Sequence, residues 1–351
     1  MGDSPIQPSF TAIPRFTNPA LSYILHQAMQ NALSIEAPCK INLHLRVKGR
    51  RSDGFHELES IFLALAFGDT LHFELKEAGG DEFLAEDRRP VTEAGLEEVP
   101  QKGNIVLKAA ELFRAKTGFD RPLRIGLEKR IPLGAGLGGG SSDGASTLLA
   151  LNELSGRPLS AEALALAGAE LGSDVPFFLG APGAGESAPG GSGAAFVSGR
   201  GEQIRPIAGP GQLGVVLVKP AFPSNTAGAF RLLDAYRAET GWNEESVRDL
   251  LPETLIGALA AHPSRWPYGN DFLPVFLAKG EPVVRDAYGA ILEKLGAQGA
   301  DFCGLTGSGS ACFGIFTDGG TAKKAVESLL RLGVFTLLTF PLARLANTVL
   351  R

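Results

Sequence analysis

The chain has 351 residues, of which 44% are hydrophobic and 20% charged, a balance typical of soluble globular proteins. This length suggests two domains rather than one. A formal net charge of −5 lacks the basic excess of a general nucleic-acid binder, and no apolar run is long enough to span a membrane. We therefore expect neither a nucleic-acid nor a membrane partner, and a monomer or weak homodimer.

The cysteine content argues against a disulfide scaffold. Cys39, Cys303 and Cys312 cannot all pair with one another and form no C-x-x-C motif, so a reducing cytoplasm is the expected location. Five histidines without a His/Cys cluster argue against a structural zinc site. The start of the chain, with Asp3 and several prolines, does not resemble a signal peptide.

The first part of the chain predicts strands after an extension. Residues 1–34 are interpreted as an N-terminal extension with a possible short helix at 23–33. Apolar and polar residues alternate over 41–47, which predicts a half-buried strand with Lys40 and Asn42 on its polar side. A turn at 52–54 and a strand around 71–75 follow, and the acidic stretch 77–103 is expected to be an irregular loop or hairpin.

The later segments complete an α+β pattern. Asn104 is placed to cap a helix that Gly118 ends, and a strand is predicted over 123–127. Helices are predicted over 142–154 and 160–171. Six glycines and two prolines in 180–195 predict a mobile surface insertion. An apolar run at 213–218 opens the second half, so the predicted domains are 35–210 and 211–351, and the class is α+β.

The strongest functional signal is a glycine-rich loop between a predicted strand and a predicted helix. Glycines allow positive φ and close approach to a ligand, and the following helix presents N–H groups and a positive dipole end suited to phosphate. The loop has neither a Walker A ending nor the acidic residue that a dinucleotide site requires. The candidate phosphate-binding residues are Pro132, Leu133, Gly134, Ala135, Gly136, Leu137, Gly138, Gly139, Gly140, Ser141 and Ser142.

Six stretches of the chain, roughly residues 35 to 345, resemble the GHMP kinases. Three of them match the general motifs of that family in order: Pro38–Leu43, the glycine-rich loop and Leu305–Ala311. Three more resemble the branch that phosphorylates the 2-hydroxyl of a cytidine-diphosphate-linked methylerythritol: Ser52–His56, Phe67–Thr70 and Leu171–Phe178. The resemblance implies ATP and Mg²⁺, the non-mevalonate isoprenoid pathway, an N-terminal β-α-β nucleotide-binding domain and a ferredoxin-like C-terminal domain.

The same resemblance assigns the catalytic and ATP-binding residues. It makes Asp174 the base and Lys40 its cationic partner, which would keep the carboxylate ionised. The alternatives are a plain helix cap for Asp174 and a solvated cation for Lys40. The resemblance also implies that Asn104 and Lys129 lie near the ribose and base of ATP. Two structural roles are equally possible at this point: a helix cap for Asn104 and an exposed cation for Lys129. No protein ligand for Mg²⁺ is assigned.

The family resemblance also suggests which residues bind the substrate. Asn42 is a candidate to orient the substrate, Phe55 and His56 are expected near cytosine, and Phe230 is a possible stacking partner. Phe55 stands where the family has tyrosine, and Cys39, where alanine is common, is interpreted as a small buried residue. Two alternatives stay open: a related kinase of mevalonate derivatives, homoserine or a sugar, and a regulator that binds nucleotide without catalysis.

Overall fold

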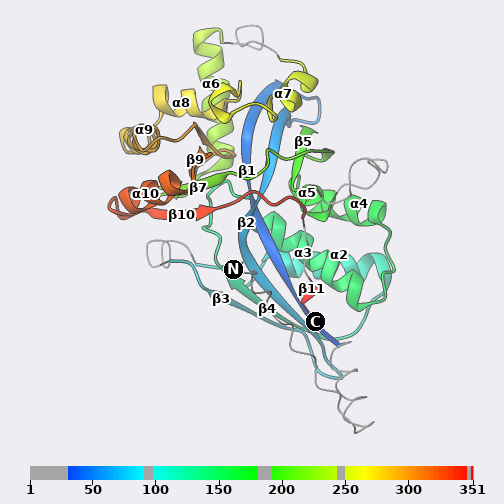
Figure 1. Cartoon of the computed structure of the whole chain (residues 1–351). Helices are drawn as coiled ribbons and strands as arrows, with labels where there is room; N and C mark the ends of the chain where they lie inside the picture. The colour runs from blue at the N-terminus through cyan, green and yellow to red at the C-terminus, as the bar shows by residue number, and fades with distance from the viewer. Residues whose placement is uncertain (1–30, 91–97, 181–191, 243–249, 346–348, 351) are drawn as a thin grey trace, which may run out of the picture.

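The computed structural model describes residues 31–90, 98–180, 192–242, 250–345 and 349–350, which form two sheets flanked by helices (Figure 1). The first sheet contains β1 (Ala32–Arg50), β2 (His56–Leu75), β3 (Glu82–Asp87), β4 (Leu123–Lys129), β5 (Ala194–Gly199), β6 (Gln203–Ile207) and β11 (Val349–Leu350). The second sheet contains β7 (Gly214–Lys219), β8 (Phe302–Leu305), β9 (Cys312–Phe316) and β10 (Phe335–Thr339).

Helices cover one face of the first sheet in Figure 1. They are α2 (Ile105–Thr117), α3 (Gly139–Leu154), α4 (Ala161–Leu171) and α5 (Val175–Leu179). Apolar residues of α2, α3 and α4 share one buried cluster with β1, β2 and β4. Because β3 and β4 pair in parallel with α2 between them, this region contains the β-α-β unit that the family resemblance implied.

The second sheet has the strand order β10-β7-β9-β8, and all of its pairings are antiparallel. Its helices are α6 (Thr226–Thr240), α7 (Pro252–Ala258), α8 (Phe272–Lys279), α9 (Pro282–Ala297) and α10 (Gly319–Leu330), with a 3₁₀ turn, η2, at Pro263–Arg265. Helices lie between the first and second strands and between the third and fourth, which is the connectivity of a ferredoxin-like domain. The predicted α+β, two-domain fold is confirmed.

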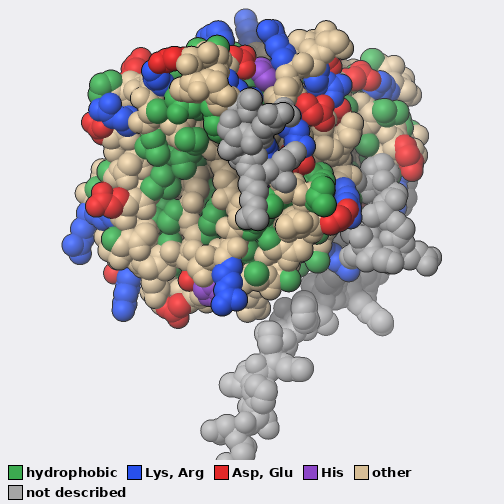
Figure 2. Space-filling model, turned by 90° about the horizontal axis from the view of Figure 1, so that it is seen from above, with side chains coloured by type: hydrophobic (Ala, Val, Ile, Leu, Met, Phe, Trp, Pro, Cys, Tyr) green, Lys and Arg blue, Asp and Glu red, His purple; other side chains and the backbone are tan. Residues whose placement is uncertain are grey.

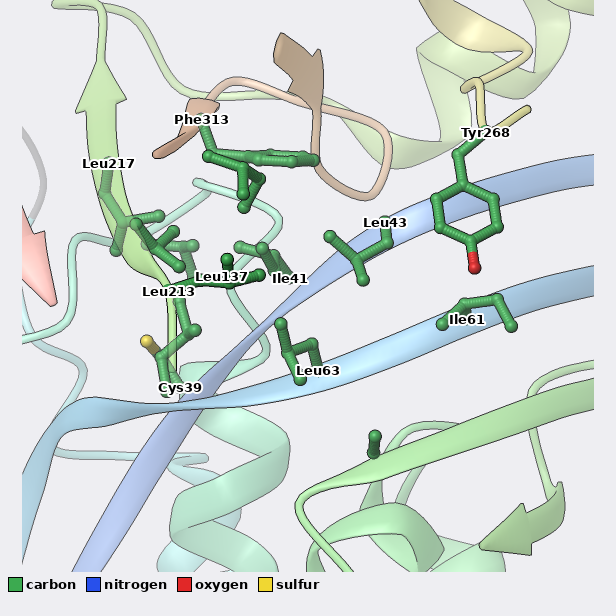
Figure 3. Close-up of a cluster of buried hydrophobic side chains, with 14 of the residues drawn as sticks. Cys39, Ile41, Leu43, Ile61, Leu63, Leu137, Leu213, Leu217, Tyr268 and Phe313 are labelled. Atoms are coloured by element: carbon green, nitrogen blue, oxygen red, sulfur yellow. The ribbon is translucent and has the colours of Figure 1, made fainter. Parts of the chain in front are cut away.

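The two sheets share a core that fixes their relative position. Figure 3 shows Ile41 and Leu43 of β1 facing Leu217 of β7 and Phe313 of β9. Cys39 belongs to the same cluster, and burial raises the pKa of its thiol. As predicted, it is a small buried residue, and all three cysteines are free.

Over residues 37–47, apart from the half-buried His44, strand β1 is buried on both sides, so the half-buried prediction is wrong for this stretch. Its apolar side chains face the shared core, while Lys40 and Asn42 on the polar side are each only 3% exposed. The period-two pattern identifies the strand but not its burial.

Opposite charges are interspersed on the face seen in Figure 2, and no helix in the described ranges is long and apolar enough to cross a membrane.

Several predicted boundaries need correction. The stretch 77–103 contains β3, which pairs with β4, and α3 begins at Gly139, three residues before the predicted start. Strand β1 begins at Ala32, so the helix expected at 23–33 is wrong at residues 32–33, whereas Asn31 is helical and residues 23–30 lie outside the described residues. Residues 181–191 of the expected insertion also lie outside them, while its last two residues belong to β5. The domain boundary near 210 stays a prediction.

Candidate active site

A pocket of about 190 Å³ lies where β1, the glycine-rich loop, the start of α5 and the loop 306–311 meet. Its lining includes Lys40, Asn42, Ser60, Phe62, Gly136, Gly138, Asp174, Gly201, Thr226, Phe230, Phe272, Gly307 and Ser308. Two larger hollows, of about 550 and about 790 Å³, lie beside β1–β4 and beside residues 209–214. Neither is lined by the glycine-rich loop or by Asp174, so the smaller pocket is the candidate site.

The glycine-rich loop leaves the N-terminus of α3 open. Gly138, in the left-handed region at φ 71°, precedes the helix, and no side chain caps it. The first N–H groups of a helix have no partner within the helix, so those of α3 are available to an anion. Positive φ occurs at Gly134, Gly136 and Gly138, whereas Gly139 and Gly140 belong to the helix. The prediction that all five glycines need conformational freedom is wrong for the last two.

The loop 306–311 holds the glycine-rich loop in place. The Ala311 N–H donates to the Ala135 carbonyl at 3.0 Å, and the Thr306 hydroxyl donates to the Gly136 carbonyl at 3.2 Å. A Cβ at Gly136 would lie 2.4 Å from the Thr306 carbonyl oxygen. Glycine is therefore required at 136 both for its positive φ and for this close approach.

Lys40 and Asp174 meet in the pocket, with 3.4 Å between Nζ and Oδ2. Strand β1 supplies the lysine, whose side chain is 4% exposed, and the residue before α5 supplies the carboxylate, which is 30% exposed. Asp174 makes no side-chain cap bond to α5, so a plain helix cap does not explain it. The Lys40 ammonium also lies 4.5 Å from the ring centre of Phe62, which restricts its position further.

Asn42 connects the lysine to the loop 306–311. Its Oδ1 accepts hydrogen bonds from Lys40 Nζ at 2.6 Å and from the Gly307 N–H at 2.9 Å, and its Nδ2 donates to the Ser60 hydroxyl at 2.9 Å. Its backbone N–H donates to the Thr306 hydroxyl at 3.0 Å. Through these bonds Asn42 positions Lys40, and because Asn42 also lines the pocket, its expected part in orienting the substrate stays a prediction.

Lys129 is buried beneath the glycine-rich loop, so the alternative of an exposed cation is wrong, and a place near the ribose and base of ATP stays a prediction. Its Nζ lies 2.5 Å from Asp69 and 2.7 Å from Asp143, which is on α3. Burial opposes its charge, but Asp143 and Asp69 attract it, and the net effect raises the pKa of Lys129. Burial raises the pKa of Asp143 well above its usual range, against the attraction of Lys129. Asp69 Oδ1 also accepts the N–H groups of Arg130 and Ile131 at 2.6 and 2.8 Å.

Asn104 serves as the predicted helix cap. Its Oδ1 accepts from the Val106 N–H at 3.0 Å, and its Nδ2 donates to the Pro100 carbonyl at 2.8 Å. This leaves little of the amide for a ribose. Ser142, in contrast, is buried with a hydroxyl that has no hydrogen-bond partner among the described residues.

Of the three residues predicted for the base, Phe230 lines the pocket and defines its aromatic end, while Phe55 and His56 are not part of the lining. His56 stacks on Phe230 with 4.8 Å between ring centres, and its Nε2 lies 2.9 Å from Asp234 Oδ1. Phe55 is 54% exposed, and Arg200 lies over its ring at 4.9 Å. The structure thus brings His56 and Phe230 together and leaves Phe55 with an arginine.

Some residues of the site were missed from sequence. Asp69 and Thr306 lie within stretches already recognised as motifs, Phe67–Thr70 and Leu305–Ala311, so the signal was present. Asp143 follows directly after the glycine-rich loop. Asp234 lies in the middle of α6, and no local pattern marks it as a partner of His56.

Two family descriptions match the chain. The GHMP kinase N-terminal domain matches residues 104–181, which include the glycine-rich loop and Asp174, and the GHMP kinase C-terminal domain matches residues 268–334. The fold and the site are therefore those of a GHMP kinase, a class that uses ATP.

Proteins similar in sequence and structure show which branch of the GHMP kinases this chain belongs to. A 4-diphosphocytidyl-2-C-methyl-D-erythritol kinase from Xanthomonas axonopodis pv. citri (strain 306) is 36% identical over 293 residues, 84% of this chain and 85% of the relative. A kinase of the same name from Polaromonas sp. (strain JS666 / ATCC BAA-500) is 39% identical over 286 residues, 80% and 82% of the two chains. A crystal structure of a 4-(cytidine 5'-diphospho)-2C-methyl-D-erythritol kinase has a TM-score of 0.66 at 30% identity and covers 88% of this chain and 98% of its own. The chain belongs to the 4-diphosphocytidyl-2-C-methyl-D-erythritol kinase family of the GHMP kinases.

Proposed function

We propose that the chain transfers the γ-phosphoryl group of ATP to the 2-hydroxyl of 4-diphosphocytidyl-2-C-methyl-D-erythritol, a step of the non-mevalonate isoprenoid pathway. The observation that carries the proposal is the Lys40–Asp174 pair, 3.4 Å apart in the pocket that the glycine-rich loop lines. Family membership supports the substrate. The cytoplasmic location stays a prediction.

Each side chain has a defined part in the proposed reaction. The open N-terminus of α3 and the glycine-rich loop bind the ATP phosphates. Asp174 accepts the proton of the 2-hydroxyl while the hydroxyl oxygen bonds to the γ-phosphorus and ADP leaves. Lys40 keeps Asp174 ionised and offsets negative charge on the reacting oxygens. Since phosphoryl transfer depends mainly on positioning and charge stabilisation, the buried Asn42 network that holds Lys40 contributes indirectly.

Mg²⁺ accompanies ATP in this proposal. The pocket lining contains one carboxylate, Asp174, already paired with Lys40. No group of three or more His, Cys, Asp or Glu side chains gathers within the part of the chain that the structure describes. This donor set fits an ion held chiefly by phosphate oxygens and water, as Mg²⁺ commonly is, where it neutralises phosphate charge.

The cytosine is proposed to bind at the aromatic end. Phe230 offers a ring for stacking, and His56 offers a ring nitrogen for a hydrogen bond. In the tautomer that carries its proton on Nε2, facing Asp234, the ring presents Nδ1 as an acceptor. An acceptor at that position suits the 4-amino group of cytosine.

An assay of ATP consumption tests the proposal. The purified chain is given ATP and Mg²⁺ with the cytidine-diphosphate substrate and, separately, with homoserine, galactose or mevalonate. We expect turnover with the cytidine substrate alone. Faster turnover of one of the other acceptors would favour a related GHMP kinase, and nucleotide binding without turnover of any would favour the regulator.

A further inference from the structure

The two ends of the proposed substrate site lie on opposite sides of an unassigned region. The hydroxyl to be phosphorylated belongs at Asp174, and the cytosine belongs near Phe230 and His56. In the substrate a diphosphate joins these two parts, so it must lie between them. Its two ionised phosphate groups need a cation, and this requirement rests on the proposed function.

The cations already described do not meet the need. Among the residues that line the pocket, Lys40 alone is positively charged, and it is committed to Asp174 and Asn42. Near the aromatic end, Arg51 lies 2.6 Å from Glu57 and 3.1 Å from Asp53. These two carboxylates neutralise the charge of Arg51, so Arg51 is not available to the diphosphate.

Arg200 lies in the tight turn between β5 and β6, which packs against both ends of the site. The Gly199 N–H donates to Glu57 Oε1 at 3.0 Å, which ties the turn to β2. At Gly201, φ is +120° and a Cβ would lie 3.5 Å from Asp174 Oδ1. The turn therefore places Arg200 next to Gly201, which lines the pocket together with the catalytic carboxylate.

The side chain of Arg200 lies over Phe55, and among the described residues no hydrogen bond engages its guanidinium donors. Its guanidinium carbon lies 4.9 Å above the ring of Phe55. Glu202, its ion-pair partner among the described residues, is 4.0 Å from Nε, beyond hydrogen-bond distance, and the arginine side chain is 34% exposed. A guanidinium that stacks on an aromatic ring still has its edge donors in the plane, where they can bind phosphate oxygens in pairs.

We propose that Arg200 binds the diphosphate of the cytidine substrate. The turn places Gly201 beside Asp174 and the guanidinium over Phe55, one of the residues predicted near the base, and it adds a second positive charge to that of Lys40 in the pocket lining. Phe55 supports the guanidinium from one face and limits its rotamers. The competing explanation is structural: Arg200 only holds Phe55 and the turn at residues 53–56 in place.

Binding of cytidine and CDP separates the two explanations. Calorimetry measures both ligands on the wild type, Arg200→Ala and Arg200→Lys. The control is Arg205→Ala, because Arg205 lies on β6 but pairs with Glu253 at 2.8 and 3.1 Å. We expect Arg200→Ala to weaken CDP by roughly tenfold or more, as for loss of a charged hydrogen bond, and to leave cytidine nearly unchanged. Arg200→Lys should fall between, and Arg205→Ala should match the wild type.

Kinetics give a second measurement. Arg200→Ala should raise the KM of the cytidine-diphosphate substrate by the same factor, while kcat and the KM of ATP change little. If Arg200→Ala weakens the binding of cytidine and CDP equally, or weakens the binding of neither, the proposal is overturned. A wild type that binds CDP through Arg200 yet does not phosphorylate the substrate overturns the proposed function alone, and one that binds neither cytidine nor CDP overturns both.

Discussion

Replacing Lys129 by methionine should destabilise the protein more than its distance from the reacting groups suggests. The substitution keeps the length of the side chain but removes the one ammonium between Asp69 and Asp143, at 2.5 and 2.7 Å. Lys129 is 3% exposed, and Asp69 is fully buried. The two carboxylates would then face each other in the interior without a cation between them.

The size of the effect follows from the burial. Removing one partner of a buried ion pair costs about 3–5 kcal/mol. For a chain of 351 residues, that corresponds to a fall in Tm of about 4–7 °C. Asp69 also binds two backbone N–H groups at the entry to the glycine-rich loop, so we expect ATP affinity to fall as well. Differential scanning calorimetry and ATP titration measure the two effects.

Asp143→Asn provides the matched control, alone and combined with Lys129→Met. The single change should cost clearly less than Lys129→Met, since it removes the carboxylate whose pKa burial raises. The double variant should regain part of the loss, because only one buried carboxylate remains. An unchanged Tm in Lys129→Met, or no gain in the double variant, would refute the reasoning.

Four further outcomes are expected. Asp174→Asn should nearly abolish turnover and leave ATP affinity almost unchanged in a binding assay. Gly136→Ala should lower Tm and ATP affinity, because its Cβ would meet the Thr306 carbonyl at 2.4 Å, whereas Gly257→Ala meets nothing within 4 Å and should do neither. His56→Ala should raise the KM of the cytidine substrate by about 5- to 150-fold without affecting that of ATP. The pKa of Asp143 is raised in the folded state, so the native protein retains a proton that the unfolded chain releases. The free energy of unfolding of the wild type, relative to that of Asp143→Asn, should therefore fall as the pH rises above about 4. Denaturant titrations at a series of pH values measure this difference.

The sequence predicted the features that depend on local pattern. Alternation identified β1, Asn104 and Gly118 marked the ends of α2, and the glycine-rich loop was placed between a strand and a helix. The start of α3 was placed too late because glycine is a poor helix former. In the structure, Gly139 and Gly140 are helical because the loop before them is fixed by contacts from residues 306–311.

Features that depend on tertiary contacts could not be predicted from local sequence patterns. Lys129 ends a strand whose neighbours alternate, a pattern that equally suits an exposed cation. Only the folded chain brings Asp69, which is 60 residues away in sequence, to its ammonium. Asp234 is likewise 178 residues from His56. The separation in both cases means that the charge partner is set by topology rather than by any motif.

The placement of Lys40 connects stability with its proposed catalytic role. The apolar side of β1 is part of the core shared by both sheets, and its polar side carries Lys40 and Asn42. Because successive strand residues point to opposite faces, every contact that holds Ile41 in the core also fixes the direction of the lysine. The Asn42 amide then couples that lysine to Gly307 in the other domain at 2.9 Å. The ammonium is therefore positioned by a rigid strand and by both domains at once, which is the positioning that phosphoryl transfer requires.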